Sequence, residues 1–194
     1  LITNTTMNMD RLVIKQILGN EQVTQYYVVS LIGKTLVLLI APINTIVISY
    51  LTKRKERLTR SQFGKAVLAG GGVSLAFFVA CQIGTPLFVW LFYRNLYESV
   101  KGIVTVVNLA QILGLFSAFL FILVLTFTDE RWQLWIQLAH FCILLVSSVL
   151  AARAYGMMGF AVASLGANSL RVAAVVILGL VKAGKDKGDR NADR

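Results

Sequence analysis

Five charged side chains lie within or beside long apolar stretches of this sequence, where charge is rare and therefore informative. A charged side chain at the centre of a bilayer costs roughly 2.5–3.5 kcal/mol even on lenient insertion scales. Such a group is therefore expected to face a polar interior or to extend toward an interface. The five residues are Asp10, Arg11 and Lys15 in the opening segment, Lys34 in the first long apolar run, and Arg171 in the last.

We predict that these residues line a polar cavity for an anionic substrate. Lys15 follows Arg11 by four residues, so both side chains project from the same face of a helix. Asp10 is adjacent to Arg11 and points about 100° away from it, so the two need not pair. A lipid diphosphate is the membrane-borne anion that suits such a cationic surface. The alternative is that Lys34 and Arg171 extend their long stems to an interface and bind nothing.

Other reactive chemistry is sparse. His140 lies in an apolar run without Cys, Asp or Glu at metal-ligand spacing, so we expect it to be packed or hydrogen-bonded. Cys81 and Cys142 have no partner motif and are interpreted as small buried hydrophobes. We therefore expect no enzyme, no cofactor and no metal site. Uncharged polar residues at similar depth are Asn44, Gln82, Asn108, Gln111 and Asn168.

The elements that must position these side chains are five apolar runs of about 19 to 27 residues. At ~1.5 Å per helical residue, each run is long enough to cross a hydrocarbon core ~30 Å thick. Hydrophobic residues make up 57% of the chain, charged residues 14%, and the mean hydropathy is +0.72. A soluble domain carries nearer a quarter charged residues. We predict an all-α polytopic membrane protein with runs at 26–51, 66–92, 103–127, 134–152 and 157–181.

The formal charge of +10 is concentrated between and after these runs rather than on one polar face, which argues against nucleic acid. Twelve basic residues fall in the segments that follow the first and third runs and in the tail, against three in the remaining loops. Basic loops stay in the cytoplasm, so we place these segments and the C-terminus there. The three basic residues on the opposite side are Arg94, Lys101 and Arg153.

The opening segment 1–19 mixes Asn, Thr and charged residues with apolar ones. We interpret it as the end of a membrane helix that lines something polar and continues upstream in a longer protein. The chain then has about six membrane helices. Residues 1–181 are expected to form one helical bundle, and residues 182–194 a polar, disordered cytoplasmic tail.

Small and aromatic residues add local expectations. Glycines at Gly70–Gly72 and at Gly156, Gly159 and Gly166 favour close helix packing, and Pro42 and Pro86 are each expected to kink their helices. Aromatic residues near the proposed interfaces are interpreted as anchors rather than as a ligand site. These are Tyr26, Tyr27, Tyr50, Trp90, Phe92, Tyr93, Tyr97, Trp132, Trp135 and Tyr155.

Several short motifs resemble those of one known family. The stretch Asp10-Arg11-Leu12-Val13-Ile14, then Leu18-Gly19-Asn20-Glu21, then Tyr26 or Tyr27 opening a long helix, is similar to the start of the second half of bacterial polysaccharide flippases. These O-antigen and exopolysaccharide translocases belong to the MOP (multidrug/oligosaccharidyl-lipid/polysaccharide) superfamily. The run from Tyr155-Gly156 to Ala163 resembles the opening of a late helix in that family.

The resemblance implies the C-terminal half of an alternating-access transporter built from two helical bundles. Such a protein flips polyprenyl-diphosphate-linked oligosaccharide across the bacterial cytoplasmic (inner) membrane for lipopolysaccharide and other surface polysaccharides. Its implied partners are the lipid-linked oligosaccharide, membrane lipids, the N-terminal half of the same protein and a polysaccharide polymerase. Basic side chains would offset the diphosphate charge, and amide and hydroxyl groups would bind the sugar.

Three alternatives remain open. Another MOP-type ion-coupled antiporter, such as a multidrug cation exporter, would favour an anionic cavity, and acidic residues at membrane depth are scarce here. A non-transporting membrane scaffold of a polysaccharide-assembly complex would tolerate loss of the basic residues. An unrelated membrane enzyme would require a catalytic domain elsewhere.

Overall fold

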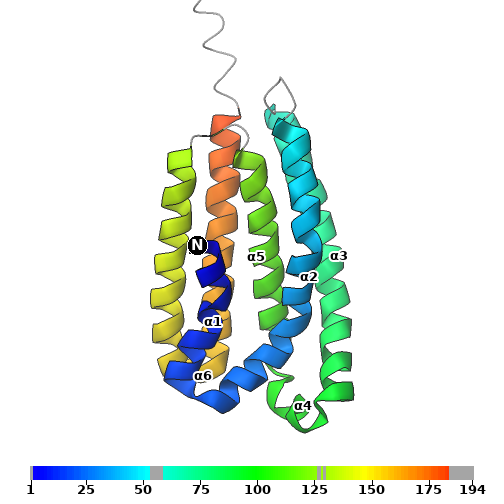
Figure 1. The fold of residues 1–194 in the computed structure, drawn as a ribbon, viewed down its shortest axis with the longest axis vertical. Coiled ribbons are helices and arrows are strands. Elements are labelled where there is room, and N and C mark those ends of the chain that lie inside the picture. Colours follow the sequence, from blue (N-terminus) through cyan, green and yellow to red (C-terminus); the bar gives the residue numbers. More distant parts are fainter. Residues whose placement is uncertain (1, 53–58, 126–127, 129, 184–194) are drawn as a thin grey trace, which may run out of the picture.

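The computed structural model describes residues 2–52, 59–125, 128 and 130–183, which form helices joined by short connections (Figure 1). No strand occurs in this part of the chain, so the expected all-α class is confirmed. The helices are α1 (Ile2–Leu18), α2 (Asn20–Thr52), α3 (Arg60–Phe92), α4 (Arg94–Val100), α5 (Val104–Leu125) and α6 (Glu130–Lys182).

Helix α6 consists of two arms rather than one straight rod. Its backbone leaves the helical region at Gly156, where φ is 62° and ψ is −144°, a conformation that glycine adopts readily and other residues do not. Hydrogen bonds between the arms join residues 28 and 34 positions apart, which a straight helix would separate by about 42 Å or more. The arms 130–155 and 157–182 therefore lie antiparallel, as the yellow-green and orange helices show in Figure 1.

Helix α5 is the centre of the bundle and packs against α2, α3 and α6. It carries no charged residue and is buried along its length. The apolar core forms two clusters toward opposite ends of the bundle. One gathers around Tyr26, Val104 and Phe160, and the other around Phe63 and Leu120.

Within the described residues, three helices are long and apolar enough to cross a membrane: α3, α5 and the Leu134–Lys182 part of α6. The exposed side chains of α3 include Leu68, Val79, Ile83 and Leu87, each more than half exposed. Water would penalise such a surface, whereas lipid tails solvate it. The chain is therefore a membrane protein. The prediction of about six crossings stays a prediction, because side chains in parts of α2 lie outside the described residues.

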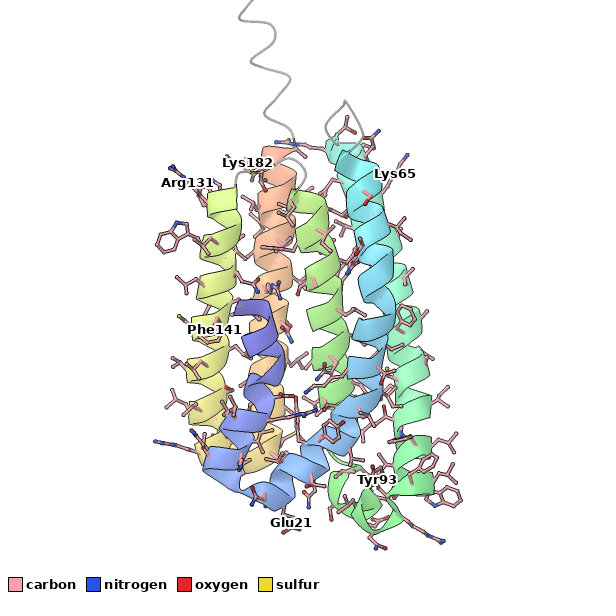
Figure 2. The ribbon with its side chains drawn as sticks, in the orientation of Figure 1. Glu21, Lys65, Tyr93, Arg131, Phe141 and Lys182 are labelled. Carbon is pink, nitrogen blue, oxygen red and sulfur yellow. The ribbon has the colours of Figure 1, made fainter. Side chains whose placement is uncertain are left out.

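The basic segments end on one side of the bundle. Figure 2 places Lys65, Arg131 and Lys182 at one end and Glu21 and Tyr93 at the other. Residues 53–58, which hold much of the predicted basic loop, lie outside the described residues, as does the tail from residue 184. The arrangement agrees with the prediction that the basic segments lie on the same side as one another. It does not show which end is cytoplasmic.

Helix α3 begins with a capping box. Thr59 Oγ1 accepts a hydrogen bond from Gln62 N at 3.3 Å, and Gln62 Oε1 accepts one from Thr59 N at 3.2 Å. These two bonds satisfy backbone donors that the first helical turn leaves free. They fix the start of α3 directly after the basic segment.

Some local expectations need correction. Tyr26 is 3% exposed and packs edge-on against Phe160 at 5.1 Å between ring centroids, so it is a core residue rather than an interface anchor. The connection between the second and third apolar runs contains the short helix α4. Close packing holds at Gly159, where an added Cβ would lie 2.1 Å from Ala151 O, whereas Gly156 forms the turn and Gly166 faces open space.

Candidate functional site

The outward surface of α1 and α2 differs from that of the other long helices. The exposed residues of α3 between Leu68 and Leu91 are apolar. By contrast, α1 and α2 expose many polar side chains, interrupted by Leu12 and Ile46. In Figure 1, α1 lies in front of the orange arm of α6 and α2 runs beside α5; the two helices meet at one end of the bundle and diverge toward the other. We call this surface the α1–α2 face, defined by Arg11, Lys15, Gln16, Thr24, Thr35, Thr45 and Ser49.

An ion pair joins the two helices of this face. Lys34 Nζ donates to Asp10 Oδ2, with side chains that are 24% and 12% exposed, respectively. Asp10 Oδ1 accepts from the backbone N–H of Arg11 at 2.8 Å. The negative charge of Asp10 therefore offsets the positive charge of Lys34 locally. Of the predicted basic residues, Lys34 is bound within the protein rather than presented free to a ligand.

Arg11 and Lys15 remain exposed on α1. The Arg11 guanidinium lies 4.3 Å from the centre of the Tyr27 ring on α2, a cation–π contact that restrains the side chain without neutralising it. At ~1.5 Å per residue, Arg11 lies about 12 Å and Lys15 about 6 Å from the turn at Gly19. Their positive charges are thus staggered along one face, as the four-residue spacing predicts.

A second layer supports the ion pair from behind. Tyr26 of α2 is buried and packs against Phe160 of α6. At Gly33, an added Cβ would lie 2.8 Å from the Gln111 Cβ. Helix α2 therefore approaches α5 closely at the turn that carries Lys34, and a larger residue at Gly33 would push this turn away from α5.

Arg171 belongs to a separate cluster. Its Nη2 donates to Gln137 Oε1 at 2.9 Å, and its guanidinium lies 5.4 Å from the centre of the Phe121 ring. The residue before Lys34, Gly33, lies against Gln111, and Gln111 and Phe121 are ten residues apart on α5, or about 15 Å along its axis. Arg171 therefore does not lie close enough to Lys34 for the two residues to form a single cationic surface.

Polar side chains in the same cluster link the arms of α6 to α5. His140 Nε2 lies 3.2 Å from Asn168 Oδ1, and Asn168 Nδ2 donates to Ala110 O at 2.9 Å. Because the Asn168 amide donates through its nitrogen, its oxygen accepts, so the tautomer of neutral His140 that fits carries hydrogen on Nε2. The expectation that His140 is a hydrogen-bonded helix residue is confirmed.

A third polar group connects α3 to α5. Asn108 is fully buried and its Nδ2 donates to Cys81 O at 3.1 Å and to Gln82 Oε1 at 3.0 Å. Thr85 Oγ1 donates to Asn108 Oδ1 at 3.2 Å. Pro86 follows and cannot donate to the carbonyl one turn before it. The Asn108 side chain thus bonds the α3 backbone beside the turn that the proline weakens.

Three contributors to these clusters were not anticipated from the sequence: Tyr27, Gln137 and Phe121. The sequence predicts only an anchoring role for Tyr27, because a position 16 residues after Arg11 gives no local indication that the two side chains are in contact. Gln137 offered a signal, because it is a polar residue one helical turn before His140 in an apolar run. Phe121 offered none.

Comparison with known proteins adds no identification. No family model, no curated protein and no solved structure matches this chain.

Proposed function

We propose that this chain forms part of a transporter that flips polyprenyl-diphosphate-linked oligosaccharide across the bacterial cytoplasmic membrane by alternating access. The observation that carries the proposal is the polar and basic α1–α2 face on a bundle whose α3 surface is apolar. The motifs that resemble polysaccharide flippases support the same function. The proposal concerns a membrane transport protein rather than an enzyme.

The chemistry of the face suits such a substrate. Lipid tails cannot solvate Arg11 and Lys15, so this surface should border a polar volume rather than acyl chains. Two exposed positive charges can offset part of a diphosphate's charge, and the hydroxyl groups of α2 can bond to sugar hydroxyls. The substrate's polyprenyl chain would stay among lipids beside an apolar surface such as that of α3.

The geometry also supports the expected topology. We propose that α1, α2, α3, α5 and both arms of α6 lie across the membrane, with the end that carries Lys65, Arg131 and Lys182 in the cytoplasm. A second bundle, from the N-terminal half of the same protein, would face α1 and α2. The cavity would then lie between the two bundles, and a polysaccharide polymerase would receive the flipped substrate.

The experiment uses the full-length protein in a bacterial strain that lacks its own oligosaccharide flippase. Surface polysaccharide and accumulated lipid-linked oligosaccharide are measured for the wild type and for Arg11→Ala/Lys15→Ala at equal membrane abundance. Arg94→Ala/Arg153→Ala is the matched control, because it also removes two exposed basic residues, from outside the α1–α2 face. We expect rescue by the wild type and the control and a loss of at least tenfold in the double variant.

The remaining outcomes discriminate among the alternatives. Rescue by all three proteins would retain a flippase but remove Arg11 and Lys15 from its binding site. Failure of the wild type with several oligosaccharide pathways would favour another MOP-type antiporter or a scaffold. For a cation antiporter, the ion pair of Asp10 with Lys34 is unfavourable, because it leaves this carboxylate without free negative charge.

A further inference from the structure

An aromatic and cationic surface lies at the end of the bundle where helix α6 both begins and ends. Lys182 is the last residue of α6, and its Nζ lies 5.7 Å from the centre of the Trp132 ring near the start of the same helix. This cation–π contact restrains the ammonium group and leaves its charge unneutralised. Arg131 precedes Trp132 and is exposed at the same end (Figure 2). Among the described residues, neither Arg131 nor Lys182 has an ion-pair partner.

The charge of this end stays positive when the neighbouring acidic residues are included. The segments that adjoin it, 52–65, 126–133 and 182–194, hold twelve basic residues and six acidic ones, with Asp129 and Glu130 among the latter. The connections at the other end hold three basic residues and two acidic ones. A positive surplus attracts anionic headgroups from a membrane surface. It favours them over zwitterionic headgroups, which carry a positive charge of their own.

An exposed apolar strip continues from Trp132 along the first arm of α6. Trp135, Leu138 and Cys142 follow at spacings of three, three and four residues, so the four side chains project from one face of the helix. All four are exposed, with Trp132 at 49% and Trp135 at 66%. The strip spans about 15 Å, which is half of a hydrocarbon core ~30 Å thick. Because tryptophan rings favour the membrane interface, the strip begins at headgroup level and extends to the depth of one leaflet.

We propose that this surface binds one anionic phospholipid, such as phosphatidylglycerol. We call it the α6 lipid site and define it by Arg131, Trp132, Trp135 and Lys182. The phosphate accepts hydrogen bonds from the Arg131 guanidinium and the Lys182 ammonium group, and an acyl chain follows the apolar strip. Because Lys182 and Trp132 come from different arms, the lipid bridges the two ends of α6, opposite the turn at Gly156. The proposal does not depend on the transport function.

The test measures lipid binding to the purified full-length protein in an uncharged detergent. Native mass spectrometry follows titrations with phosphatidylglycerol and with phosphatidylcholine of the same acyl chains. We expect the apparent affinity for phosphatidylglycerol to be at least tenfold higher. Lys182→Gln should weaken its binding roughly fivefold, and Arg131→Gln/Lys182→Gln by more than tenfold. Trp132→Leu keeps both charges but removes the ring that restrains Lys182, and it should weaken binding several-fold.

Lys65→Gln is the matched control, because it removes one exposed basic residue at the same end, from α3 rather than α6. This variant should bind phosphatidylglycerol as the wild type does. Should the double variant fail to fold, the comparison of Lys182→Gln and Trp132→Leu with Lys65→Gln carries the test. Equal affinities for the two lipids would overturn the proposal, and so would equal losses in Lys65→Gln and Lys182→Gln. Competition by soluble glycerol phosphate at the same concentration as the lipid would exclude a phospholipid as the occupant.

Discussion

Lys34 of α2 is ion-paired with Asp10 of α1, 24 positions earlier in the chain. Because α1 and α2 diverge from the turn at Gly19 (Figure 1), this pair ties them together away from their covalent connection. It also leaves Arg11 and Lys15 as the exposed basic residues of α1. The pair thus has two consequences: it fixes the position of α1, and it decides which positive charges are free.

The first prediction concerns this pair. We expect Asp10→Asn and Lys34→Met each to destabilise the protein, because each leaves a partly buried charge unpaired. The double variant should be less destabilised than the sum of the two, with a coupling energy of about 0.5–3 kcal/mol. Unfolding in a graded mixture of mild detergent and sodium dodecyl sulfate measures all four free energies. Additive effects would show that the two side chains do not interact.

The contact of Arg11 with Tyr27 yields a second prediction. Tyr27→Phe keeps an aromatic ring under the guanidinium, whereas Tyr27→Leu removes it and loses about 0.5–2 kcal/mol of cation–π attraction. If the ring positions Arg11 for substrate, transport should fall several-fold in Tyr27→Leu and stay near wild type in Tyr27→Phe. Export of surface polysaccharide at equal protein abundance is the measurement. Equal export by the two variants would show that the contact between Arg11 and Tyr27 is not needed for transport.

Asn108 provides a test of polar packing between α3 and α5. Asn108→Leu removes the partner of Thr85 and leaves the Cys81 carbonyl and the Gln82 side chain without the Asn108 donor. We expect destabilisation of about 1–2 kcal/mol, near the upper range for hydrogen bonds between membrane helices. Ser99→Ala, at an exposed position in α4, serves as the control and should be neutral. Free energies of unfolding in detergent decide the outcome.

The sequence and the structure agree where a local pattern is sufficient. Long apolar runs predict α3, α5 and the arms of α6, and the distribution of basic residues predicts which helix ends lie together. The partners of the charged residues could not be predicted from a local pattern, because they depend on how helices that are distant in the sequence pack together. Lys34 and Asp10 share no sequence spacing, and Arg171 reaches Phe121 and Gln137 only because α6 folds back. Tyr26 was misplaced for the same reason, since burial by Phe160 of α6 leaves no local signal.

Membrane orientation gives a further prediction. With Cys81 and Cys142 replaced, single cysteines at Arg60, Arg131 and Lys182 should react with an impermeant maleimide only after the cytoplasmic side is opened. Cysteines at Arg94 and Arg153 should react in intact spheroplasts, because these residues lie outside the basic end. The positive-inside rule is the physical basis. Labelling of Arg131→Cys from outside would invert the proposed topology.

Gly156 allows the two arms of α6 to fold back, and its substitution tests that role directly. A Cβ at Gly156 would meet no atom within 4 Å, so Gly156→Ala introduces backbone strain at φ 62° without a steric clash. We expect a loss of stability of about 1–3 kcal/mol. Gly166→Ala is the matched control: Gly166 lies on the arm that follows Gly156, also in open space, and its backbone is helical, so alanine there should be neutral or stabilising. Denaturation of both variants in detergent gives the comparison, and equal stabilities would mean that the fold-back does not depend on glycine.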